Sequence, residues 1–215
     1  EGNILIIRPP VFYVEADNDI FCLVSYDPVM YFQGPDTIKE IWRAVITGVG
    51  LHIICDDPDV LTGAVYASQS VVTPLLYKDN ILITLNPEDE RFKDVDIYNI
   101  VATPSNVDPT TFKNFKCTVE ARLTTINTNS SSSKKLRDEI RAKTRRVVEI
   151  NVFMMDRMLR KNPFNDILEG PYMTDDADPL FEPKKKKNMP ILLPDEYRMV
   201  EKTETFRNYR RKILY

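Results

Sequence analysis

The sequence predicts an α/β fold, with a layered, mostly parallel sheet flanked by helices and followed by a helical tail. Through residues 1–123, short apolar segments alternate with amphipathic segments of helical period, which is the order of elements in α/β proteins. Residues 136–215 instead carry long charged segments with helical spacing. Residues 124–135 are rich in Ser, Thr and Asn and too poor in apolar side chains to pack. We therefore expect an α/β module, a linker and a helical C-terminal subdomain.

The first helix is predicted from Thr37 to Gly48. Thr37 and Glu40 have the spacing of a capping box, and Gly48 suits the left-handed conformation that ends a helix. The apolar side chains that recur at helical spacing are Ile38, Ile41, Trp42, Val45 and Ile46. We expect Trp42 to be buried between this helix and the sheet.

The segment Leu51–Cys55 is nearly all apolar, which is typical of a strand at the centre of a sheet and covered on both faces. Asp57 and Pro58 follow as an N-cap and a first-turn proline, so a second helix is predicted from there to Pro74. An aromatic-rich connection at 28–32 and a charged loop at 86–94 join the elements. Further strands are predicted at Ile20–Val24, Ile81–Leu85, Ile97–Ala102 and Phe115–Leu123.

The tail begins with a long predicted helix from Lys134 to Lys161 and ends with another from Pro194 to Leu214. The long helix carries ten Lys and Arg residues against four acids. A solvated helix face explains this excess most simply, and the alternative is contact with an acidic partner or an anionic membrane surface. The run Lys184–Lys187 follows acidic residues and is interpreted as an exposed loop.

The composition is that of a globular protein. Of the 215 residues, 43% are hydrophobic, which excludes a disordered chain. The formal net charge of −3 leaves no basic surplus, so we expect no nucleic-acid partner. No apolar run approaches the roughly 18 residues of a membrane span, and the start lacks the pattern of a signal peptide, so we expect a cytoplasmic protein. The cysteines lack disulfide or metal-ligand spacing, and free thiols are expected at Cys22, Cys55 and Cys117.

Residue types that carry catalysis are sparse. His52, the single histidine, lies within the predicted central strand and is interpreted as a core or sheet-edge residue. Asp56, Asp57 and Asp59 stand at a helix start, where capping explains them better than a metal site. Neither a Gly-rich phosphate loop nor a nucleophile elbow occurs. No catalytic residue, cofactor or metal ligand is therefore predicted.

The order of motifs over residues 19–104 is more specific than any one of them. In chain order the motifs are Asp19-Ile20-Phe21, Asp27-Pro28-Val29-Met30, Ile41-Trp42-Arg43-Ala44-Val45-Ile46-Thr47-Gly48, Thr73-Pro74-Leu75-Leu76-Tyr77 and Tyr98-Asn99-Ile100-Val101-Ala102-Thr103-Pro104. This order resembles the central and C-terminal parts of DENN-domain proteins. The nearest subgroup has a helix with Trp-Glu-Leu-Val-Leu-x-Gly before a strand, and Pro-Leu-x-Tyr at the close of the next helix. Arg43 and Ala44 replace the residues that usually follow the tryptophan.

The resemblance implies a Rab GTPase partner and guanine-nucleotide exchange in membrane trafficking, with no cofactor and no covalent catalysis. It implies recruitment from the cytoplasm to endosomal or other vesicle membranes by peripheral contact. A longin-type N-terminal lobe, or another DENN-like subunit, would be a second partner. The alternative function is a non-catalytic DENN-type scaffold in a complex that regulates small GTPases. A third, from another class, is a small-molecule enzyme with its ligand at the strand ends.

An exchange factor of this kind would present polar and aromatic side chains on loops at one edge of its sheet, because loops on a rigid scaffold carry most binding. Two segments have that character. The predicted partner-binding residues are Tyr26, Asp27 and Phe32 in the first, and Asp89, Arg91 and Phe92 in the second. The alternative for Phe32 and Phe92 is that each closes the core beneath its loop.

Overall fold

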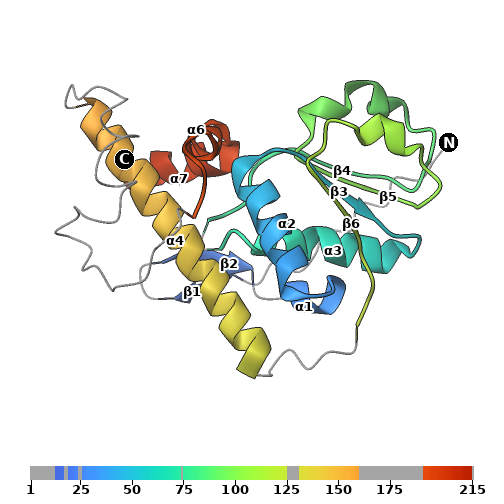
Figure 1. Cartoon of the computed structure of the whole chain (residues 1–215), viewed down its shortest axis with the longest axis horizontal. Helices are drawn as coiled ribbons and strands as arrows, with labels where there is room; N and C mark the ends of the chain where they lie inside the picture. Colours follow the sequence, from blue (N-terminus) through green and yellow to red (C-terminus); the bar gives the residue numbers. More distant parts are fainter. Residues whose placement is uncertain are drawn as a thin grey trace.

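A four-stranded parallel sheet organises the molecule, and the predicted α/β fold is confirmed (Figure 1). The computed structural model describes residues 13–16, 19–23, 26–73, 75–124, 131–159 and 191–214. The strands of the main sheet are β3 (Leu51–Ile54), β4 (Ile81–Ile83), β5 (Ile100–Thr103) and β6 (Cys117–Glu120), in the order β4-β5-β3-β6. A separate antiparallel pair comprises β1 (Tyr13–Ala16) and β2 (Asp19–Leu23), and β2 overlaps the strand predicted at 20–24 but begins one residue earlier.

Strand β3 lies between β5 and β6, so the prediction of a central strand at 51–55 is confirmed. Leu51 and Ile53 are 0% exposed and face one side of the sheet, while the buried His52 faces the other. The continuous apolar run reflects this burial on both faces. The other strands of the main sheet are shorter than predicted, and Ile97 ends a 3₁₀ helix instead of starting β5.

Two layers cover the sheet. Helices α2 (Pro35–Thr47) and α3 (Pro58–Ser70) pack on the face that carries Leu51 and Ile53, and the 3₁₀ helices η1 (Glu90–Ile97) and η2 (Pro109–Phe112) pack on the opposite face (Figure 1). The connection from β3 to β4 uses the first face, and those from β4 to β5 and from β5 to β6 move the other way over the second. A connection that runs in the opposite direction over the opposite face of the sheet has the same hand. All three connections therefore share one handedness, as the strong preference for one crossover hand requires.

Near the start of the α/β module, one helix begins earlier than predicted and one helix was not predicted. Helix α2 begins at Pro35, after Gly34 at φ +83°, so the capping box predicted at Thr37 is wrong, and Thr37 lies inside the first turn. Proline at the first helical position already has the required φ, which favours the earlier start. The end predicted at Gly48 is confirmed, with φ +68°. The connection expected at 28–32 contains a one-turn helix, α1 (Pro28–Tyr31).

The tail also differs in detail. Helix α4 (Ser131–Leu159) begins inside the predicted linker, and the serines that suggested a linker form its first turn. The single final helix predicted at 194–214 is two helices, α6 (Pro194–Lys202) and α7 (Glu204–Leu214), broken at Thr203. The break is stabilised by Asp79, whose carboxylate accepts hydrogen bonds from the backbone N–H groups of Glu204 at 2.7 Å and Thr205 at 3.2 Å.

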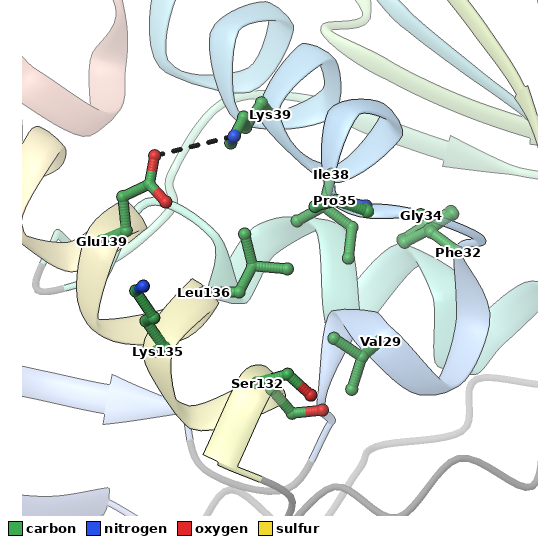
Figure 2. Close-up of a pocket in the computed structure, with 11 residues that line it drawn as sticks. Val29, Phe32, Gly34, Pro35, Ile38, Lys39, Ser132, Lys135, Leu136 and Glu139 are labelled. Carbon is green, nitrogen blue, oxygen red and sulfur yellow. Dashed lines mark ion pairs between the residues drawn. The ribbon is translucent and has the colours of Figure 1, made fainter.

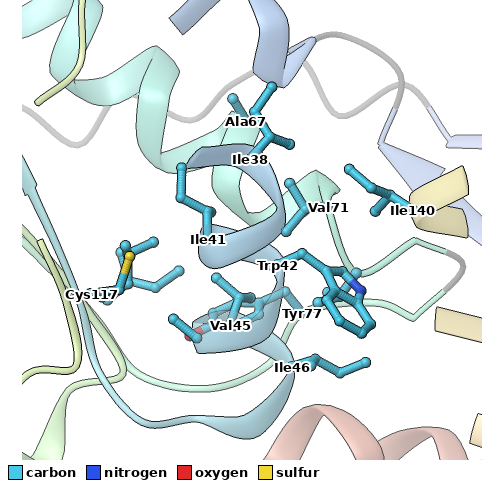
Figure 3. Close-up of a cluster of buried hydrophobic side chains, with 14 of the residues drawn as sticks. Ile38, Ile41, Trp42, Val45, Ile46, Ala67, Val71, Tyr77, Cys117 and Ile140 are labelled. Atoms are coloured by element: carbon cyan, nitrogen blue, oxygen red, sulfur yellow. The ribbon is translucent and has the colours of Figure 1, made fainter. Parts of the chain in front are cut away.

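The C-terminal helices share their core with the sheet. One cluster of buried side chains runs from β3 through α2 into the tail, where its members are Ile140, Val147, Val148, Leu192, Tyr197, Val200 and Phe206. Trp42 is 4% exposed and lies within this cluster (Figure 3). Its indole N–H donates to Thr144 on α4. Its burial was predicted, but its place between α2 and the sheet was wrong, because the indole instead faces the tail.

Candidate functional site

The first predicted partner-binding segment, residues 26–32, joins the α/β module to the tail. Asp27 Oδ1 accepts a hydrogen bond from the Val29 N–H at 3.1 Å and so caps α1. Its other oxygen, Oδ2, forms an ion pair with Arg137 of α4. The Asp27 side chain is 12% exposed, and both of its oxygens have structural partners. Asp27 therefore holds the segment in place and offers little surface for another protein.

The aromatic residues of this segment separate into core and surface. Phe32 is 1% exposed and belongs to the main core, as the alternative interpretation held. Tyr31 is also buried, and burial raises the pKa of its hydroxyl. Tyr26 is half-buried and packs its ring against Tyr66 of α3, with 5.2 Å between ring centroids. Of the residues predicted in this segment, Tyr26 is the one whose ring remains partly open to a partner.

A groove lies beside this segment, between α1, α2 and the first turns of α4, with a volume of about 350 Å³ (Figure 2). Figure 2 shows Leu136 of α4 opposite Ile38 of α2 and Val29 of α1, so the lining is apolar. The rim carries Lys135, exposed on α4. The sequence did not predict this groove, because its far wall comes from residues assigned to a linker.

The charges at the groove are partly neutralised. Lys39 Nζ lies 3.7 Å from Glu139 Oε1 and 3.8 Å from Asp36 Oδ1, so α2 and α4 are bridged across the rim (Figure 2). A hydrogen bond from Lys143, followed by the charges of Lys143 and Lys39, holds the pKa of Glu139 below its ordinary value. Lys135 has no ion pair within the described part of the chain. The groove thus combines apolar walls with one open positive charge.

The second predicted segment, residues 88–92, is held by its own contacts. Asp89 caps η1 by accepting a hydrogen bond from the backbone N–H of Arg91 at 2.9 Å. Its carboxylate also accepts hydrogen bonds from the Arg91 side chain, from Nε at 2.9 Å and from a terminal guanidinium nitrogen at 2.6 Å. The Arg91 hydrogen bonds hold the pKa of Asp89 well below its usual range. Phe92 is half-buried and meets Phe112 edge-on, with 5.5 Å between ring centroids, so it closes the core under its loop.

The sheet separates the two segments. Tyr26 and Phe32 pack with the cluster on the α2 and α3 face, whereas Phe92 packs with Leu82 and Val95 on the η1 face. The structure therefore does not bring the six predicted residues together at one edge. The two segments therefore form separate surfaces.

The carboxyl ends of β3 and β5 meet where an α/β sheet commonly binds small ligands. There, Asp56 accepts hydrogen bonds from the Ser105 N–H at 2.8 Å and hydroxyl at 2.9 Å. Asp57 caps α3, as predicted, through the N–H groups of Asp59 and Val60. Within the described ranges, no group of His, Cys, Asp and Glu side chains could hold a metal ion.

His52 is a core residue, as predicted. Its exposure is 4%, and its ring stacks on Phe112 with 3.8 Å between centroids. Thr103 gives its hydroxyl hydrogen to the Pro104 carbonyl, so the 2.9 Å contact with His52 is a bond donated by Nε2–H. Burial lowers the pKa of His52 to about 4. The thiol of Cys117 is buried and that of Cys55 half-buried, and both are free.

The long basic helix packs firmly along one side. Ile140, Thr144 and Val147 are buried, while Lys134, Lys135, Arg141 and Arg145 are exposed. None of the described helices is long and apolar enough to cross a membrane. The loop predicted at 184–187 and the side chain of Cys22 lie outside the described residues.

Comparison of the chain with protein-family models, with curated proteins and with solved structures found no match.

Proposed function

We propose that this chain is a DENN-type module, an α/β unit with its helical tail, in a guanine-nucleotide exchange factor for a Rab GTPase. The proposal places it in the cytoplasm, recruited peripherally to endosomal or other vesicle membranes, with a longin-type lobe or another DENN-like subunit as a second partner. The observation that carries it is the motif order over residues 19–104, combined with an α/β module against whose helix α2 the C-terminal helices pack.

The motif residues that suggested the family have structural roles consistent with a shared fold. Trp42 links α2 to α4, and Gly48 ends α2 in the left-handed region. Leu75 and Tyr77, from the motif that follows α3, are buried at 3% and 9% exposure. These buried and helix-ending residues support a similarity of fold to DENN-domain proteins. The Rab GTPase partner is inferred from that family.

The surface proposed to meet the GTPase is the ring of Tyr26 together with the apolar groove between α1, α2 and α4. Tyrosines are enriched among interface hot spots, and an apolar groove can receive a side chain of the partner. Lys135 at the rim adds a charge suited to an acidic group on the partner. Exchange requires tighter binding to the nucleotide-free GTPase than to its GDP complex, and an interaction surface alone can provide that difference.

The experiment is a release assay with fluorescent GDP on a panel of Rab GTPases, using the full-length protein. We expect faster release from at least one of them. Tyr26→Ala combined with Lys135→Glu should reduce that acceleration, whereas Lys113→Glu, an exposed charge reversal on the opposite face of the sheet, should leave it unchanged. Binding to a Rab without faster release would support the scaffold alternative, and equal effects of both variants would remove the groove from the site.

A further inference from the structure

Strand β4 is the last strand at its edge of the sheet within the described residues, and its backbone is arranged to accept another strand. The carbonyl of Asn80 accepts a hydrogen bond from the Ile100 N–H at 3.3 Å, and the N–H of Thr84 donates to the Ala102 carbonyl at 3.1 Å. Along a strand in a parallel sheet, the N–H and C=O groups of successive residues point alternately to the two neighbouring strands. Since Asn80 and Thr84 bond to β5, the backbone groups of Ile81 and Ile83 face away from it. An edge of this kind is a template for strand addition.

Two exposed apolar side chains mark the ends of this edge. Leu85, just after β4, is 51% exposed. Ile97 is 56% exposed, and its carbonyl accepts a hydrogen bond from the Asn80 side chain at 3.1 Å, which places it beside the start of β4. Apolar side chains at both ends would contact the alternate side chains of an added strand.

The connection that borders the edge is acidic. Residues 84–99 hold five acids against two bases, and one of those bases, Arg91, is already paired with Asp89. Glu88, Glu90 and Asp94 are exposed and have no ion pair among the described residues. A second copy of the chain, paired edge to edge, would bring two acidic connections together and be repelled. A basic strand would be attracted.

We propose that the β4 edge binds an extended, basic segment of another protein by strand addition. The segment would alternate apolar and Lys or Arg side chains. Its backbone would pair with Ile81 and Ile83, and its cations would face the exposed acids of the β4–β5 connection. This surface lies apart from the groove between α1, α2 and α4, so it goes beyond the proposed exchange function.

The first test uses peptide probes on the whole chain. A fluorescent peptide of alternating Lys and Val should bind, with slower amide hydrogen exchange at Ile81 and Ile83. The same peptide N-methylated along its central residues should bind about ten-fold more weakly or worse, because it loses the backbone pairing. A Glu and Val peptide should not bind. No binding of the Lys and Val peptide, or equal binding of the methylated one, would overturn the proposal.

The second test changes the protein at exposed positions. Glu90→Lys with Asp94→Lys should weaken binding of the Lys and Val peptide about ten-fold, whereas Asp138→Lys with Glu149→Lys, the same charge change on α4, should have little effect. Ile83→Pro removes one outward N–H, and Thr118→Pro removes its counterpart on β6 at the opposite edge. Loss of peptide binding with Ile83→Pro but not with Thr118→Pro supports the proposal. Equal loss of peptide binding with the two charge-reversed pairs, or with the two proline variants, would overturn it.

Discussion

The indole N–H of Trp42 donates a hydrogen bond to Thr144 Oγ1 over 2.9 Å, joining helices α2 and α4 across 102 positions of the sequence. Both side chains are buried, and the Thr144 hydroxyl in turn donates to the Ile140 carbonyl at 3.1 Å. The bond therefore ties the tail to the helical layer over the sheet, and its polar atoms have no access to water as a substitute partner.

Replacing either partner of this bond should destabilise the whole chain. Thr144→Val leaves the buried indole N–H unpaired, which costs about 1–3 kcal/mol in the free energy of unfolding. Trp42→Phe removes the donor, and Trp42→Ala should cost roughly 3–5 kcal/mol through the cavity it leaves. In urea unfolding followed by circular dichroism, Trp42→Phe with Thr144→Val should cost less than the two single changes together. Additive costs would show that the two side chains are not coupled.

Asp79 is expected to hold α7 against the α/β module. Asp79→Ala removes the acceptor for the N–H groups of Glu204 and Thr205, and loss of a cap costs about 1–2 kcal/mol. Arg43→Ala breaks a more exposed contact of the tail, the ion pair with Glu196, and should cost below about 1 kcal/mol. Thermal unfolding of both variants tests this order, and a larger loss for Arg43→Ala would contradict it.

His52 should make the stability fall as the pH is lowered from about 6.5 to about 4. The folded-state pKa of about 4 lies below the ordinary 6.5, so the unfolded chain binds the proton first. The stabilisation is complete above pH 6.5 and, for a shift of this size, on the order of 3 kcal/mol is lost by pH 4. Because His52 is the only histidine, its NMR titration is unambiguous, and a midpoint near 6.5 would refute its burial as a neutral ring.

Gly63 should not tolerate a methyl group. In the middle of a helix, Gly→Ala ordinarily stabilises a protein by roughly 0.5–1 kcal/mol. A Cβ at Gly63 would lie 2.5 Å from the ring and hydroxyl of the buried Tyr31, so Gly63→Ala should destabilise instead. Gly63→Ala combined with Tyr31→Leu gives the matched control, since the shorter side chain removes the clash. A higher melting temperature for Gly63→Ala alone would show that α1 can move away from α3.

The fold was predictable where one local pattern determined it. The apolar run at Leu51–Ile54 indicated a strand buried on both faces, and Gly48 indicated the end of α2. The direction of Trp42 was not predictable, because helical periodicity identifies an apolar face without identifying which element covers it. Ser133 was assigned to a linker on composition, but it is 6% exposed in the first turn of α4, where tertiary packing overrides weak helix propensity.

The candidate site was less predictable than the fold. Phe32 and Phe92 looked like loop aromatics, yet each packs under its own segment, and the sheet separates them. The Asp27–Arg137 ion pair and the groove beside Leu136 depend on contacts between residues about a hundred positions apart. Only the spacing of Leu136 and Ile140 hinted that this part of α4 has a packed face.

The affinity of the full-length protein for each nucleotide state of a Rab GTPase tests the central claim most directly. An exchange factor lowers the affinity of the GTPase for GDP only as far as it prefers the nucleotide-free form. We expect at least one Rab to bind about ten-fold or more tightly when nucleotide-free than when loaded with GDP. Tyr26→Ala with Lys135→Glu should reduce that difference. Equal affinity for the nucleotide-free and GDP-loaded forms of every Rab tested, or no binding to any of them, would contradict the proposed exchange function.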